Sequence, residues 1–170
     1  MKNMKFGFVG ALAIATAMFF AGSSDPCKDI TCANGDCVEG VCVCDAGYEG
    51  LSCETAFNAA YTGTYSLTES CTASGAAGPY SVTVAPKSSS TFDVTFVGLW
   101  EVPSNIVTAK VSTTASTSFS IERQTITTGF EIEATGGSIS ADGKTINLTY
   151  KIYATGATTV SDQCTATLTK

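Results

Sequence analysis

Histidine is absent from all 170 residues of the chain. It is the commonest general base and neutral metal ligand in proteins, so Ser-His and Cys-His catalytic arrangements are excluded. The chain also lacks a glycine-rich phosphate-binding loop and any segment with a helical hydrophobic period. We therefore expect a protein that is not an enzyme and that binds no metal or other cofactor.

Basic residues are scarce. Nine Lys and Arg face 15 Asp and Glu, which gives a formal net charge of −6. An acidic surface is repelled by phosphate backbones, so we expect no nucleic-acid partner.

The first 23 residues have the composition of a secretory signal peptide. Lys2 and Lys5 precede an uncharged stretch, residues 6–21, and small residues lead to a cleavage position after Ser23. This stretch is shorter than the ~20 residues that span a bilayer, although a retained membrane anchor is the alternative. Serines stand where a lipid-modified cysteine would be, so we predict a secreted, extracytoplasmic protein without a lipid anchor or membrane span.

The chain has eight cysteines, and six of them lie between Cys27 and Cys53 with the spacing C-x4-C-x4-C-x4-C-x-C-x8-C. So short a segment buries too little apolar surface to fold alone, whereas each disulfide stabilises it by roughly 2–4 kcal/mol. This spacing predicts an oxidised module outside the cytosol, but by itself it allows 15 pairings of the six cysteines.

Residues 25–54 resemble an EGF-like module. The resemblance lies in Cys42-Val43-Cys44 and in the closing loop from Cys44 to Cys53, which contains Gly-Tyr-Glu-Gly. It implies the disulfides Cys27–Cys37, Cys32–Cys42 and Cys44–Cys53. The calcium-binding pattern of such modules is absent before Cys27 and after Cys37, so we expect no calcium site.

The remainder of the chain alternates between apolar and polar residues. In Thr145–Ile152 the apolar residues Ile146, Leu148, Tyr150 and Ile152 share one face, which is typical of a half-buried strand. With this strand included, the alternation predicts about eight strands, separated by turn signals such as Asp142-Gly143. It predicts an all-β domain of sequential antiparallel strands, with Phe92, Phe96, Phe119, Phe130 and Val160 facing inward.

Two closures of this sheet are possible, an eight-stranded up-and-down barrel or a β-sandwich. Cys71 lies at the end of the first strand and Cys164 within the last, and both share the inward parity. Because the first and last strands are neighbours in a barrel, a Cys71–Cys164 disulfide favours the barrel.

Residues 57–170 resemble the lipocalin-like β-barrel domains found in secreted proteins of Bacteroidota-type bacteria. The shared features are Tyr61-Thr62-Gly63-Thr64-Tyr65, the following Cys71, and the hairpin over residues 139–146. Tyr65 stands where true lipocalins have tryptophan, and residues 165–170 lack their arginine. The resemblance implies an up-and-down barrel whose interior carries a small apolar ligand.

Two residues are candidates for ligand binding. Asp162 shares the parity of Cys164 and is either an inward polar contact for a ligand at the barrel mouth or a residue ahead of the apolar face. Trp100, the only tryptophan, lies in a predicted loop and is either a partner-binding anchor or lid, or a plug for the barrel end.

These features predict a secreted, non-enzymatic binding or adhesion protein, with a short linker over residues 54–60 joining the module to the barrel. The alternatives are a carrier of a small apolar ligand in the barrel interior and an inhibitor of a secreted hydrolase. The partner is accordingly a protein, a glycan or a small apolar molecule.

Overall fold

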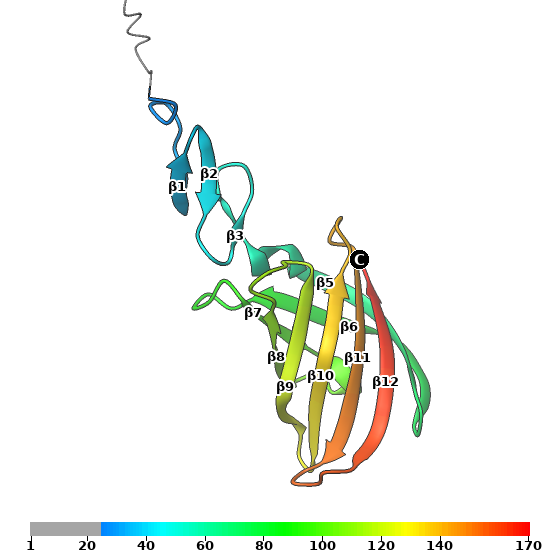
Figure 1. The fold of residues 1–170 in the computed structure, drawn as a ribbon. Coiled ribbons are helices and arrows are strands. Elements are labelled where there is room, and N and C mark those ends of the chain that lie inside the picture. The colour runs from blue at the N-terminus through cyan, green and yellow to red at the C-terminus, as the bar shows by residue number, and fades with distance from the viewer. Residues whose placement is uncertain (1–24) are drawn as a thin grey trace, which may run out of the picture.

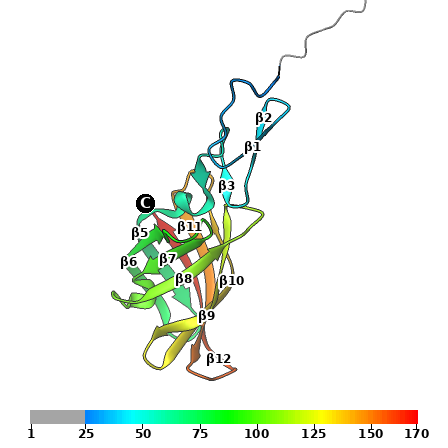
Figure 2. The same cartoon turned by 90° about the vertical axis from the view of Figure 1, so that its left-hand side faces the viewer.

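The computed structural model describes residues 25–170; the predicted signal peptide, residues 1–23, lies outside the described residues. The described chain is mostly β-structure. A small disulfide-rich module is followed by a closed antiparallel barrel of eight strands, so the barrel prediction is confirmed over the sandwich. Figures 1 and 2 show the module at one end of the barrel, the module end. The opposite end is the distal end.

The six-cysteine module is built on a hairpin of β1 (Gly35–Val38) and β2 (Val41–Cys44). Glu39 and Gly40 between them both have positive φ, as a two-residue type I′ turn requires. A second small sheet pairs β3 (Tyr48–Glu49) with β4 (Thr55–Ala56). The disulfides are Cys27–Cys37, Cys32–Cys42 and Cys44–Cys53, the three expected pairs.

The segment expected to be a linker is ordered and bonded to both parts. After β4 it forms a short 3-10 helix, η1 (Phe57–Tyr61). The Phe57 N–H donates to the Gly47 carbonyl in the module, and the Asn58 side chain donates to the carbonyls of Ser90 and Asp93 in the barrel at 2.6 and 2.9 Å. Asn58 therefore ties η1 to the module end of the barrel.

The barrel strands follow one another around the wall in sequence order, and the last strand returns to the first. They are β5 (Gly63–Cys71), β6 (Gly75–Pro86), β7 (Asp93–Val97), β8 (Ile106–Val111), β9 (Ser118–Thr127), β10 (Phe130–Ile139), β11 (Thr145–Ala154) and β12 (Val160–Thr169). The connection between β7 and β8 contains a second 3-10 helix, η2 (Leu99–Glu101). Up-and-down order places this connection at the distal end, together with the turns β5–β6, β9–β10 and β11–β12.

Large apolar side chains fill the barrel interior. Twelve of them are less than 2 % exposed: Tyr61, Tyr65, Tyr150, Phe96, Leu67, Leu99, Ile121, Ile132, Ile146, Leu148, Ile152 and Leu168. Gly137 makes room for the Phe119 ring, because a Cβ at this position would overlap the ring. The register between β10 and β11 shifts between Glu133 and Gly136, next to this glycine.

Three of the residues expected to face inward do not. Val160 is 43 % exposed because the β11–β12 register shifts between Ile152 and Tyr153 and reverses the parity at the start of β12. Phe130 is 37 % exposed, beside a register shift at the start of β10. Phe92 precedes β7 and packs edge-on against Phe57, with ring centroids 6.0 Å apart. Phe96 and Phe119 lie in the core as expected.

Candidate functional site

The distal end of the barrel holds both residues that the sequence singled out. Trp100 lies in η2 and is partly buried against the core, with its ring edge-on to Phe130 at a centroid distance of 5.1 Å. Trp100 and Glu101 both have left-handed backbones, with φ of 56° and 53°, a strained conformation for side chains of this size. The Trp100 ring thus covers part of the barrel end and does not project freely into solvent.

Asn105 holds the η2 connection in place. Its side-chain amide donates to the Leu99 carbonyl at 2.6 Å, and its carbonyl oxygen accepts from the Gly98 N–H at 3.0 Å. The Trp100 N–H donates to the Tyr80 hydroxyl at 3.1 Å, which ties the connection to β6. Because Asn105 and Leu99 are buried, the connection is part of the barrel packing.

Asp162 is buried and points at the β5–β6 turn. Its carboxylate accepts the N–H groups of Ala73 and Ser74 at 2.8 and 3.0 Å and the hydroxyls of Thr72 and Ser74 at 3.0 and 2.7 Å. Burial disfavours the charged form of Asp162, but these hydrogen bonds outweigh burial and hold its pKa well below the usual range. The carboxylate therefore joins the start of β12 to the neighbouring turn.

A second buried carboxylate, Glu69, lies inside the barrel. It is 6 % exposed, and its two oxygens accept hydrogen bonds from the hydroxyls of Tyr80, at 2.8 Å, and Tyr150. Burial and the neighbouring Glu69 raise the pKa of both tyrosines above the ordinary value. Sequence reasoning missed Glu69, although it shares the inward parity of Leu67 and Cys71.

The Glu69 carboxylate also lies beside Cys71 and Cys164, and the potential ligand atoms of these three residues are within 4.8 Å of one another. Both sulfurs belong to one disulfide. They are therefore not thiolates, the form in which cysteine binds metals. This cluster serves as barrel packing.

The exposed face of the β1–β2 hairpin carries three valines, Val38, Val41 and Val43, which we call the valine face. They are 52 %, 66 % and 57 % exposed. Cys37 and Cys42 lie opposite each other on the other face of the hairpin. There each forms its disulfide with a cysteine that precedes the hairpin. The alternation of the two strands therefore separates a disulfide face from an apolar face in solvent.

The module that carries the valine face is acidic. Residues 25–54 contain seven carboxylates and one lysine, a net charge of −6: Asp25, Asp29, Asp36, Glu39, Asp45, Glu49 and Glu54 against Lys28. Asp36 pairs with Val43 across the hairpin, and Glu39 occupies its turn. The module thus combines an exposed apolar face with a net negative charge, and two of its carboxylates, Asp36 and Glu39, lie on the same hairpin.

Comparison with protein-family models and with curated proteins found no match to this chain. The four disulfides, which use all eight cysteines, indicate an oxidising extracellular environment. Within residues 25–170, no helix has both the length and the apolar character needed to cross a membrane.

Proposed function

We propose that this is a secreted, non-enzymatic binding or adhesion protein, in which an EGF-like module on a lipocalin-like barrel binds a protein partner through its valine face. The observation that carries this proposal is the exposure of Val38, Val41 and Val43. By contrast, the barrel buries Val82, Val84, Val94, Val107 and Val111 to 3 % exposure or less.

Clustered apolar side chains on a soluble protein mark interaction surfaces more often than isolated ones do. The valine face is held rigid by Cys27–Cys37 and Cys32–Cys42, so little conformational entropy is lost when a partner covers it. The carboxylates of the module favour a partner whose apolar patch is bordered by lysine and arginine. Binding should therefore weaken as salt is added.

Because side chains fill the barrel interior, binding at the valine face is better supported than carriage of a ligand inside the barrel. Eight strands leave an interior that side chains can just fill, and here the space is taken up by residues such as Tyr65, Tyr150 and Phe96, each 1 % exposed or less. The four buried polar or charged residues of the described chain include Glu69 and Asp162, whose oxygens are bonded to neighbouring side chains and turns.

The test is binding of labelled chain, residues 25–170, to surface material of the cells that secrete it. We expect the variant Val38→Ser/Val41→Ser/Val43→Ser to bind at least about tenfold more weakly, since it loses apolar contact area worth more than ~1.4 kcal/mol. Val160→Ser is the matched control, because Val160 is an exposed valine on the barrel. Equal binding by the triple variant and the wild type would refute the proposal.

A further inference from the structure

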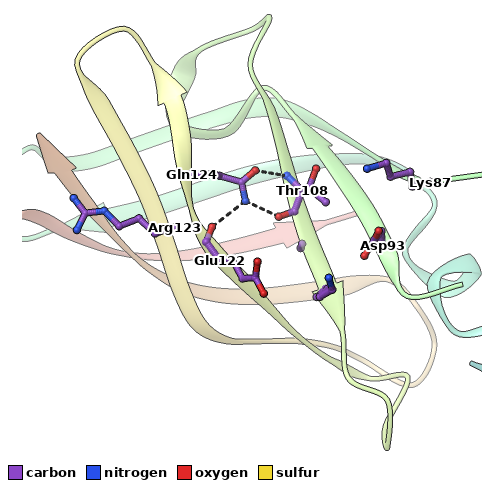
Figure 3. A pocket seen from close by; sticks show the side chains of 8 residues that line it. Lys87, Asp93, Thr108, Glu122, Arg123 and Gln124 are labelled. Carbon is purple, nitrogen blue, oxygen red and sulfur yellow. Dashed lines mark hydrogen bonds between the residues drawn. The ribbon is translucent and has the colours of Figure 1, made fainter. Parts of the chain in front are cut away.

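Neighbouring strands β8 and β9 separate toward the distal end, leaving what we call the seam. Their register contains only Lys110 opposite Ser120 and Val111 opposite Phe119. Every other two neighbouring strands of the barrel wall have at least four pairs of residues in register. Figure 3 shows the two strands diverging, with the Gln124 side chain reaching from β9 to β8.

The Gln124 amide bonds to the Thr108 backbone. The Thr108 N–H donates to Gln124 Oε1 at 2.8 Å, and Gln124 Nε2 donates to the Thr108 carbonyl at 2.7 Å (Figure 3). In an antiparallel hydrogen-bonded pair, each residue offers its partner one N–H and one carbonyl. The side-chain amide offers the same donor and acceptor, so it occupies the place of one residue of a missing strand.

The same edge of β8 continues beyond Thr108. The Val111 N–H donates to Phe92, before β7, whereas the Ser112 N–H donates to Ser118 at the start of β9. Alternation therefore turns the backbone groups of Thr108 and Ile106 toward the seam. Ile106 is 63 % exposed, and its pairing within the described barrel is with Val97 of β7.

A groove of about 350 Å³ lies over the seam. Its lining includes Lys87, Lys110, Asp93 and Glu122 in addition to Thr108 and Gln124, as Figure 3 shows for the labelled side chains. Within residues 25–170 the only ion pair joins Arg123 to Glu131, so the two lysines are not in salt bridges. Each lysine can pair with an acidic side chain of a ligand, although Asp93 and Glu122 in the same lining balance their charge.

We propose that the seam binds an extended peptide segment of another protein as an added strand beside β8. The peptide displaces the Gln124 amide from Thr108, bonds to Thr108 and Ile106, and places an acidic side chain near Lys87 and Lys110. Residues 106 and 108 are two apart, which matches the spacing at which an extended peptide presents successive N–H and carbonyl pairs to one neighbour. The exchange at Thr108 conserves its two hydrogen bonds, so the contacts at Ile106 and at the lysines are the net gain.

The probe is a capped, fluorescein-labelled hexapeptide of alternating threonine and valine with glutamate at its third position. Its binding to residues 25–170 is measured by fluorescence anisotropy. We expect Gln124→Ala to bind the probe at least threefold more tightly than the wild type, because the competing amide is gone. Gln163→Ala, an exposed glutamine on β12, is the matched control and should leave the affinity unchanged.

Two further arms test the geometry without relying on that variant. N-methylation of alternate residues removes the donors from one edge of the probe, so one of the two methylated isomers should lose binding and the other keep it. The double variant Lys87→Glu/Lys110→Glu should weaken binding of the glutamate probe about tenfold, and a probe with lysine at that position should recover it.

Each arm has an outcome that overturns the proposal: no binding of the probe to the wild type, equal binding of both methylated isomers, or no change on charge reversal. If Gln124→Ala fails to fold, the methylated probes on the wild type decide the question. The valine-face variant should bind the probe like the wild type, because the valine face and the seam are separate, so the two proposals fail independently.

Discussion

Cys71 and Cys164 lie directly opposite each other on β5 and β12, with their α-carbons 4.0 Å apart, and their disulfide joins the first strand of the barrel to the last. The two residues are 93 positions apart in the sequence, so the bond closes a loop that includes most of the barrel. Closing such a long loop restricts the unfolded chain more than the short loops of the module do.

We therefore expect Cys71→Ala/Cys164→Ala to lower the free energy of unfolding by about 2–5 kcal/mol, measured by urea denaturation without reductant. β5 and β12 retain six paired positions, so the barrel should still close and the far-ultraviolet circular dichroism should be unchanged. An unchanged urea midpoint would show that the bond contributes nothing to stability.

The Glu69 network predicts a loss of stability in alkali. The pKa values of Tyr80 and Tyr150 are raised in the folded chain, by burial first and then by Glu69, so the unfolded chain releases these protons at lower pH. Their contribution is complete below pH ~10 and is lost as the pH rises above it, at up to about 1.4 kcal/mol per pH unit for each tyrosine. Urea titrations between pH 8 and pH 12 measure this slope.

Tyr150→Phe tests whether Tyr150 contributes to this loss of stability. It removes one titrating group, so the decline of the free energy of unfolding with pH should become shallower by the equivalent of about one proton. It also leaves one Glu69 oxygen without its donor, which should cost about 1–3 kcal/mol at neutral pH. Tyr48→Phe, in the module, is the control and should change neither quantity. A slope that is the same in Tyr150→Phe and in the wild type would contradict the assignment.

Much of this fold follows from period-two alternation and cysteine position. The alternation of residues 145–152 identified β11, and the inward parity of Cys71 and Cys164 identified the closure of the barrel. The same rule placed Val160 and Phe130 wrongly, because register shifts reverse parity and depend on contacts between strands. The shifts at Val160 and Phe130 could not be read from the alternation of β12 or β10 alone.

The polar parts of the site were harder to predict. Glu69 has inward parity, but a carboxylate on a buried face is unexpected until Tyr80 and Tyr150 are known to donate to it. The seam leaves one sequence signal: Ile121 and Ile126 are both buried although they are five residues apart, so the alternation of β9 breaks between them. The bonds from Gln124 to Thr108 could not be predicted from β9 alone, because they depend on the position of β8.

Asp162 predicts a loss of stability in acid. The pKa of its carboxyl is lowered in the folded chain: burial opposes the charge, but hydrogen bonds from Ser74, Ala73 and Thr72 outweigh it. Its contribution is present above pH ~4 and is lost as the pH falls below that value. Asp162→Asn should therefore reduce the free energy of unfolding at pH 7 by about 1.5–3 kcal/mol and make its decline between pH 5 and pH 2 shallower.

Asp142→Asn is the matched control for this prediction. Asp142 is also a turn carboxylate, but it is exposed and accepts only the Ser140 hydroxyl and the Lys144 N–H from its own hairpin. Its substitution should change stability less. Hydrogen exchange at the Ala73 and Ser74 amides, faster in Asp162→Asn alone, would locate the effect at the β5–β6 turn; unchanged exchange there would refute it.

Trp100 reports on the distal end because no other tryptophan is present in the chain. Its ring is partly buried and contacts Phe130, so acrylamide should quench its fluorescence less than that of free N-acetyltryptophanamide. Phe130→Ala should increase the quenching and lower the free energy of unfolding by about 0.5–1.5 kcal/mol for the lost aromatic contact. Phe92→Ala, which removes the contact with Phe57 near the module end, should leave the quenching unchanged. Quenching of the wild type equal to that of the free compound would mean that the ring projects into solvent and is available as a partner-binding anchor.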